Sequence, residues 1–228
     1  MVVDVLNDPG GREQLLKLGV RNVPVVAKGE NYVFGQNLED VAEFVGLQGT
    51  GHKPLPPDQL LRKWINVLRA LQRYVRQMAA GRINERVIEN RDRSIRLLAY
   101  HAFRIGEAFL ESAIDGVEYA VQHANVPPKD GTFLTGAEIA GYGEEVIGRL
   151  QKWWGELEDK SLSAKMKTYY GMQPMHAVFE RSTWHSAQHA RQLMHVLERF
   201  GIEPDGRLTP QDLAGLPLPE RLFEWLSD

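Results

Sequence analysis

The chain has 228 residues, enough for one large domain or two small ones with hydrophobic cores. Hydrophobic residues make up 43% and charged residues 25%, and the net charge is -3, so the composition fits a globular protein without the basic excess that binds nucleic-acid phosphates. The absence of cysteine excludes disulfides, thiolate catalysis and thiolate metal ligands, so any metal would have to be bound by nitrogen and oxygen atoms.

No apolar run approaches the roughly 20 residues that a membrane-spanning helix needs. The N-terminal sequence also lacks the charged and apolar regions of a signal peptide. We therefore expect a cytoplasmic protein that has neither a membrane nor a nucleic acid as its partner.

The N-terminal part predicts a small α/β module. Asn7 or Asp8 can cap its first helix, which Gly19 ends, and Asn37 can cap its last helix, which Gly46 ends. The β-branched runs between the helices indicate short strands. The predicted order is strand, helix, strand, strand and helix, at residues 2–6, 9–18, 23–27, 32–34 and 38–46.

Residues 18–46, LGVRNVPVVAKGENYVFGQNLEDVAEFVG, resemble the later three quarters of a glutaredoxin or thioredoxin-like domain. The resemblance implies that Pro24 follows a cis peptide bond beside the active site and that Gly35 lies in the thiol-binding groove, which makes them candidate cofactor-binding residues. The strand and helix that carry CxxC or CxxS in that family are absent, and without cysteine dithiol chemistry cannot occur. A truncated module, an unrelated small α/β unit and a module completed by a longer native chain are the alternatives.

A linker rich in glycine and proline, residues 48–57, separates this segment from a region with apolar residues at helical spacing. Thr135 can cap one of the helices in this region, and the loop 124–133 is long enough to cross from one end of a bundle to the other. Four long amphipathic helices are expected, at residues 58–80, 93–123, 136–159 and 175–200.

Three histidines fall on the apolar faces of two of these helices. His185 and His189 are one turn apart on the last long helix, so their imidazoles can converge on one ion, and His101 on the second helix is the candidate third ligand. The alternative is that each is a core histidine satisfied by one hydrogen bond. His123 lies near a predicted helix end, where it is expected to cap carbonyls or face water.

LLAYHAFRIGEAFL, followed far downstream by WHSAQHARQL, resembles the DinB/YfiT-like superfamily, whose signature is a histidine on the second helix and HxxxH on the fourth. The resemblance covers about residues 58–200. It implies a four-helix bundle with a long crossover that is often dimeric and binds zinc, nickel or iron. Characterised relatives include metal-dependent thiol S-transferases and a mycothiol-dependent isomerase.

The predicted fold class is therefore mainly α, a DinB-like four-helix bundle with a small N-terminal α/β segment that is partly thioredoxin-like. We expect a homodimer. The predicted segments are the thioredoxin-like segment, the linker, the bundle and a C-terminal packing arm, at residues 1–47, 48–57, 58–203 and 204–228.

We expect His101, His185 and His189 to hold a divalent metal whose open position binds water or a thiol. A low-molecular-weight thiol would then attack an electrophilic small-molecule substrate. Gln188 and Gln192, one turn from the ligands, are the candidate catalytic residues that orient an imidazole or a bound water, with a solvated face as the alternative. The second hypothesis is a noncatalytic dimerising, sensing or adaptor module with a structural metal or none, so enzymatic activity stays an open question.

Overall fold

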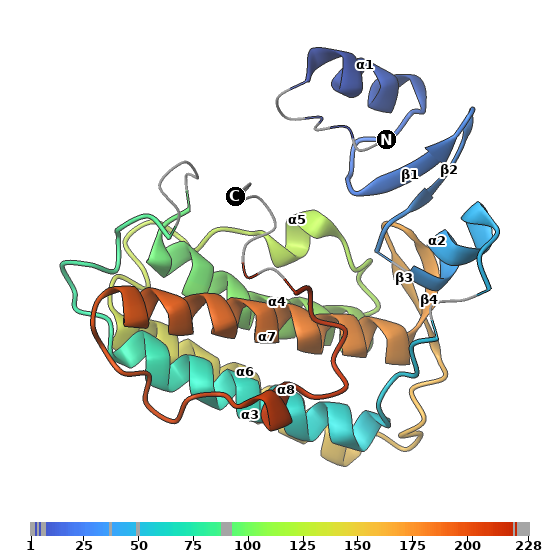
Figure 1. Ribbon diagram of the computed structural model, residues 1–228. Coiled ribbons are helices and arrows are strands. Elements are labelled where there is room, and N and C mark those ends of the chain that lie inside the picture. Colours follow the sequence, from blue (N-terminus) through green and yellow to red (C-terminus); the bar gives the residue numbers. More distant parts are fainter. Residues whose placement is uncertain are drawn as a thin grey trace. The chain divides into compact units, whose positions relative to one another are not determined.

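Two units make up the chain, residues 1–53 and 54–228, in this computed structural model. Most of the chain is helical, and two small antiparallel sheets of two strands each occur among the described residues (Figure 1). The structure describes residues 3, 5, 8–36, 38–48, 51–87, 93–220 and 222.

The described residues of the N-terminal unit form two short helices and one hairpin. Asp8 caps the first helix by accepting a hydrogen bond from the Gly10 amide at 2.9 Å, and the chain turns out of that helix at Gly19, whose φ is 70°. These two helix boundaries are as predicted. The elements are α1 (Pro9–Lys17), β1 (Val25–Lys28), β2 (Asn31–Phe34) and α2 (Leu38–Val45).

The strand predicted at residues 2–6 is not observed where the structure describes that segment. Val3 and Val5 belong to no strand, while Val2, Asp4 and Leu6 lie outside the described residues. A strand needs a neighbour that pairs with its backbone groups, and β1 and β2 pair only with each other among the described residues. Asn37 and Asn7, which were expected to cap helices, also lie outside the described residues.

In the second unit, the part that the structure describes has four long helices, with two short helices and a hairpin between and after them. Thr135 caps the third of the long helices with a complete capping box, as predicted. The elements are α3 (Pro57–Arg76), α4 (Ile95–Asp115), α5 (Val121–Ala124), α6 (Gly136–Glu156), β3 (Lys165–Thr168), β4 (Gly171–Pro174), α7 (Met175–Arg199) and α8 (Pro210–Leu213).

The long helices pack so that α3 and α4 each lie along both α6 and α7 (Figure 1). Each helix contributes one aromatic ring to the centre of the core: Trp64 from α3, Phe109 from α4, Trp153 from α6 and Phe179 from α7. The ring centroid of Phe179 lies 5.2 Å from that of Trp64, 5.1 Å from that of Phe109 and 5.8 Å from that of Trp153. These contacts hold α4 and α7 side by side, and that pair carries the three histidines of the predicted metal site.

Two parts of this unit differ from the prediction. The second long helix ends at Asp115 rather than at residue 123, because Gly116 adopts the left-handed conformation, with φ 67°. The segment between the third and fourth long helices, for which no strand was predicted, contains the β3–β4 hairpin, which pairs in antiparallel register from Lys165↔Pro174 to Thr168↔Gly171. Strands of only four residues show little of the alternation by which a strand is recognised.

The chain after α7 returns along α3 and then reaches α7 again. The Leu208 amide donates to the hydroxyl of Tyr74 at 2.9 Å, and the Lys63 ammonium donates to the carbonyl of Gln211 at 3.0 Å, so this segment is fixed to α3. Farther on, the Leu222 carbonyl lies beside α7, where it accepts a hydrogen bond from Gln188 at 2.6 Å. Part of the C-terminal chain is therefore placed next to the histidine-bearing helix.

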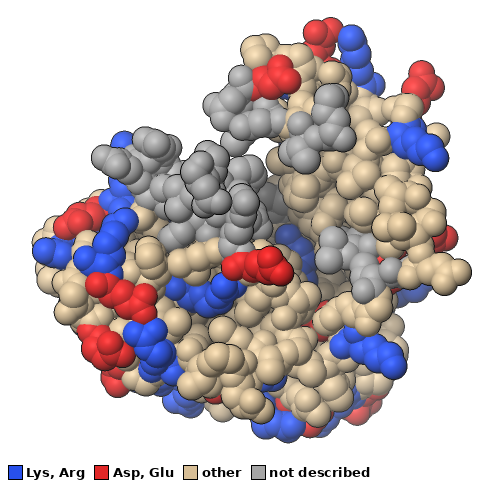
Figure 2. Space-filling model, in the orientation of Figure 1, with Lys and Arg blue, Asp and Glu red and all other residues tan. Residues whose placement is uncertain are grey.

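Charged side chains of both signs are interspersed among the described residues on the visible face, without a broad area of one sign (Figure 2). Among the described residues, none of the helices has the length and apolar character needed to cross a membrane.

Candidate metal centre

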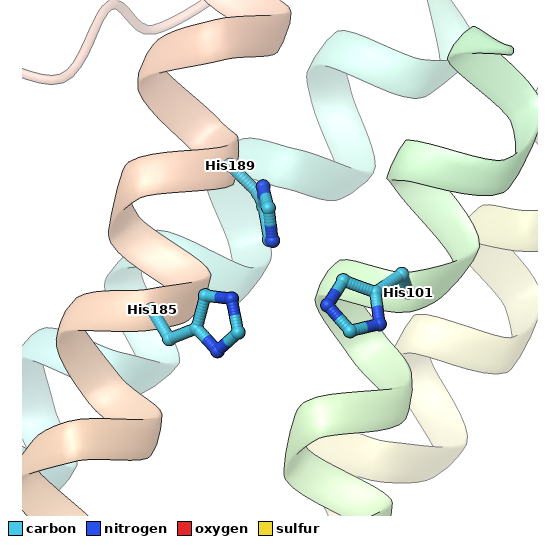
Figure 3. Close-up of side chains that lie close together, drawn as sticks. All are labelled: His101, His185 and His189. Carbon is cyan, nitrogen blue, oxygen red and sulfur yellow. The ribbon is translucent and has the colours of Figure 1, made fainter. Parts of the chain in front are cut away.

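His101 extends from α4 toward His185 and His189, which extend from neighbouring turns of α7 (Figure 3). The spacing of four residues on α7 places its two imidazoles on one face of the helix, as the sequence predicted. The side-by-side packing of α4 and α7 brings the third imidazole to the same point.

The three rings are close enough to share one ion. Their centroids are 5.4 Å apart for His101 and His185, 5.0 Å for His101 and His189, and 4.8 Å for His185 and His189. One nitrogen of each ring lies within 4.8 Å of the corresponding nitrogens of the other two. Around a tetrahedral zinc with bonds of about 2.0–2.1 Å, such nitrogens are about 3.3 Å apart. Small rotations of the side chains would close this difference, so the cluster could hold a metal ion.

His101 is oriented by the backbone of the short helix α5. Its Nδ1 lies 2.7 Å from the Ala124 carbonyl, which can only accept, so Nδ1 carries the proton and donates. Nε2 of this ring therefore has its lone pair available for a metal. A histidine ligand whose other ring nitrogen donates to a carbonyl is the usual arrangement at metal sites.

His189 is oriented in the same way by a side chain. Its Nδ1 lies 2.8 Å from Oε1 of Gln192, and Nε2 of Gln192 donates in turn to the Leu222 carbonyl at 3.0 Å. Because that carbonyl requires a donor, the amide of Gln192 must present its oxygen to the imidazole. Nδ1 of His189 is then the donor, and its Nε2 is the nitrogen that is available for a metal.

No hydrogen bond among the described residues orients Nδ1 of His185, in contrast to Nδ1 of His101 and of His189. The ring is half-buried, and its Nδ1 is buried without a hydrogen-bond partner in the part of the chain that the structure describes. A core histidine would be expected to satisfy this nitrogen, because a buried polar atom left unsatisfied costs about 1–3 kcal/mol. The reading of all three residues as ordinary core histidines therefore accounts poorly for His185.

The surroundings favour neutral imidazoles. Burial lowers the pKa of His101 and of His185 well below the usual 6.5, and the neighbouring imidazole of His189 lowers both further. A neutral imidazole has the lone pair that a metal requires, whereas a protonated one does not. His101 and His185 could therefore bind a metal at neutral pH without first losing protons.

Gln188 has different contacts from Gln192, although both were predicted as catalytic residues. Its Nε2 donates to the Leu222 carbonyl at 2.6 Å, and its Oε1 accepts from Arg191 at 2.8 Å. Arg191 also donates to the Pro219 carbonyl at 2.8 Å. These contacts of Gln188 fix the C-terminal chain against α7, whereas Gln192 touches a histidine directly.

The candidate cofactor-binding residues Pro24 and Gly35 lie in the N-terminal unit. The Val23–Pro24 peptide bond is cis, and the Gly35 amide donates to the Pro24 carbonyl at 2.9 Å. A side chain at Gly35 would meet the proline ring, since its Cβ would lie 3.0 Å from Cγ of Pro24. The two residues are thus neighbours within their own unit.

His123, the histidine not expected to be a ligand, lies in α5, and its Nδ1 is 2.9 Å from the Glu118 carbonyl. Sequence reasoning did not identify Ala124 or Leu222, which hold the site through their carbonyls. Every residue has a carbonyl, so no residue type could have pointed to these two positions.

Comparison with known proteins finds no family model, no curated protein and no solved structure that matches this chain. The three imidazoles and the groups that orient them are therefore the features that indicate a metal centre.

Proposed function

We propose that this protein is a divalent-metal enzyme whose metal is bound by His101, His185 and His189. The observation that carries the proposal is the meeting of three imidazole nitrogens from two helices within 4.8 Å of one another. Two of the rings donate their second nitrogen to an oxygen atom, and the third has a buried nitrogen without a partner among the described residues. The first feature is typical of histidines that bind a metal, and a metal at the second would give a buried nitrogen a partner.

The donor set favours zinc, nickel or iron(II). Neutral imidazoles suit these ions, whereas magnesium and calcium prefer carboxylate and carbonyl oxygens. Three protein ligands leave a coordination position for water or substrate, and structural zinc sites commonly use four. A catalytic metal fits this arrangement better than a structural one.

We propose that the reaction is the transfer of a low-molecular-weight thiol to an electrophilic small molecule. A bound divalent ion lowers the pKa of a thiol or water at its open position. His101 and His189 are kept in their ligating tautomers by Ala124 and Gln192, so the protein supplies a fixed site at which the nucleophile is bound and oriented.

The long helices and the order of the histidines along the chain also support a four-helix bundle of the DinB-like kind. Thiol transfer is proposed because characterised members of that superfamily include metal-dependent thiol S-transferases. By the same resemblance we propose a homodimer. From the thioredoxin-like resemblance we separately propose that Pro24 and Gly35 can contact a thiol within the N-terminal unit.

The proposal is tested by metal analysis of protein purified without a nickel column. We expect about one zinc, nickel or iron per chain in the wild type, and less than a tenth of that in His101→Ala, His185→Ala and His189→Ala. His195→Gln is the matched control, because His195 is on the same helix with a side chain that is 48% exposed, and it should keep the metal.

The same preparations are assayed with several thiols and electrophiles before and after chelation. Activity that is lost on chelation and restored by one metal would support the enzyme. A wild type without stoichiometric metal would contradict the proposal. Metal binding without any metal-dependent turnover would favour the noncatalytic sensing or adaptor module.

A further inference from the structure

Arg181 lies on α7 one turn before His185, and its charge has no acidic counterpart among the described residues. The residue is half-buried, and its Nε is buried without a hydrogen-bond partner in the described part of the chain. No described carboxylate forms an ion pair with it, whereas the buried Arg104 on α4 pairs with Glu111 at 2.8 Å. A buried charge is costly unless it is paired, so the absence of a carboxylate requires an explanation.

Three tyrosines surround this guanidinium instead of a carboxylate. Its Cζ lies 5.9 Å from the ring centroid of Tyr170, whose ring is 4.9 Å from that of Tyr169 in an edge-on arrangement. Burial by itself would lower the pKa of Arg181, but charge interactions with Tyr119, Tyr170 and Tyr169 and a side-chain hydrogen bond with Tyr119 raise it above its usual value. Arg181 is therefore a permanent cation among neutral hydroxyl groups and aromatic rings.

Backbone pairing fixes the positions of these tyrosines. The Tyr119 amide donates to the Lys167 carbonyl at 2.9 Å, and the Tyr169 amide donates to the Tyr119 carbonyl at 3.2 Å. The segment after α4 is thus joined to the β3–β4 hairpin that precedes α7. The hydroxyl of Tyr119 lies 3.3 Å from that of Ser182, which ties the group to α7 itself. Parts of the chain that are far apart in sequence are held together around one cation.

We infer that Arg181, with Tyr119 and Tyr170, binds a carboxylate group of the small-molecule substrate beside the three-histidine site. One guanidinium carries a single positive charge in a planar fork that matches a carboxylate, and a tyrosine hydroxyl can donate a further hydrogen bond to it. A phosphate dianion would leave uncompensated negative charge at a single cation. The group that completes this site is therefore a carboxylate rather than a phosphate.

Arg181 is close enough to His185 for one small molecule to reach both residues. Residues four apart on a helix project from the same face and are separated by about 6 Å along its axis. A molecule held at Arg181 by its carboxylate would need only two or three further bonds to reach the neighbourhood of His185. This inference rests on the proposed function, because it names the substrate of the same site as a small carboxylic acid that carries a thiol or an electrophilic carbon.

The test compares 3-mercaptopropionate with its neutral amide, which differ only in the charge of one end. Their dissociation constants are measured by calorimetry with wild type, Arg181→Gln, Arg181→Lys and Tyr119→Phe, each as purified and after chelation. We expect the wild type to bind the acid about tenfold more tightly than the amide. Arg181→Gln should bind both equally with unchanged metal content, and Arg181→Lys and Tyr119→Phe should show intermediate preferences.

Equal binding of acid and amide by the wild type would overturn the inference. An undiminished preference for the acid in Arg181→Gln would also overturn it. If circular dichroism shows that Arg181→Gln does not fold, an undiminished preference in Arg181→Lys would overturn it instead. The metal proposal can fail separately. A wild type that contains no metal but prefers the acid, with the preference lost in Arg181→Gln, would exclude the metal enzyme and keep the carboxylate site.

Discussion

His189 donates a hydrogen bond from Nδ1 to Oε1 of Gln192, 2.8 Å away and one turn farther along α7. The same amide donates to the Leu222 carbonyl at 3.0 Å, so the imidazole is connected through one side chain to the C-terminal part of the chain. This contact decides the tautomer of His189 and the direction in which its other nitrogen points.

Gln192→Ala should therefore weaken metal binding without removing a ligand. The loss of a group that orients a histidine ligand typically reduces metal affinity 10-fold to 100-fold. Competition with a chelating indicator dye measures the affinity. Gln151→Ala, an exposed position on α6, is the control and should leave it unchanged. An affinity equal to that of the wild type in Gln192→Ala would show that the hydrogen bond does not prepare the site.

His185→Leu should change stability in opposite directions with and without metal. In the metal-free protein the substitution removes a buried nitrogen that has no partner among the described residues, so the free energy of unfolding should rise by about 1 kcal/mol. With metal at 100 times its dissociation constant, the free energy of unfolding should rise by about 2.7 kcal/mol in the wild type and hardly at all in the variant. Urea denaturation with chelator and with zinc measures both effects. A variant that is less stable than the wild type in chelator would indicate that His185 is an ordinary core residue.

Hydrophobic periodicity predicted which face of each long helix is buried, and this pattern by itself was enough to expect the three histidines inside the protein. Val146 and Leu150 on α6, and Val178 and Leu193 on α7, are buried as their spacing of 3.6 residues per turn requires. Local capping signals at Asp8 and Thr135 were equally informative, because each depends on one side chain and the adjacent amides.

What could not be predicted depends on contacts between distant parts of the chain. The Ala124 carbonyl orients His101 directly, and the Leu222 carbonyl acts on the site through Gln192, but every residue has a carbonyl, so its role cannot be read from the residue type. The group around Arg181 was missed for a related reason, since Tyr119 reaches it through backbone pairing with the β3–β4 hairpin and through its hydroxyl beside Ser182.

Two glycines of α6 should respond in opposite ways to substitution by alanine. At Gly136 a Cβ would lie 2.0 Å from the Val75 carbonyl oxygen of α3, and backbone atoms cannot move aside cheaply. We therefore expect Gly136→Ala to lower the free energy of unfolding by about 1–3 kcal/mol. At Gly141 a Cβ would meet nothing within 4 Å, so Gly141→Ala should gain about 0.5–1 kcal/mol from the higher helix propensity. Urea denaturation of both variants measures this. Equal effects would mean that α3 and α6 do not approach closely at this point.

The stability of the metal-free protein should fall as the pH decreases from about 6.5. Burial lowers the pKa of His101 and His185 in the folded protein, whereas the unfolded chain titrates near the usual 6.5. Below pH 6.5 the unfolded state takes up protons that the folded state does not, which favours unfolding, and above that pH both states are neutral at these sites. Within this window, each of the two histidines should lower the free energy of unfolding by up to about 1.4 kcal/mol for every unit by which the pH decreases.

Urea denaturation in chelator at intervals from pH 8 to pH 5 measures this dependence. The double variant His101→Asn, His185→Asn should flatten the curve, because an asparagine amide does not titrate and can still donate to the Ala124 carbonyl. Gln151→Ala, at an exposed position on α6 that does not titrate, is the control and should keep the wild-type slope. A double variant with an undiminished slope would assign the pH dependence to other groups and would argue that the two imidazoles are not held neutral by burial.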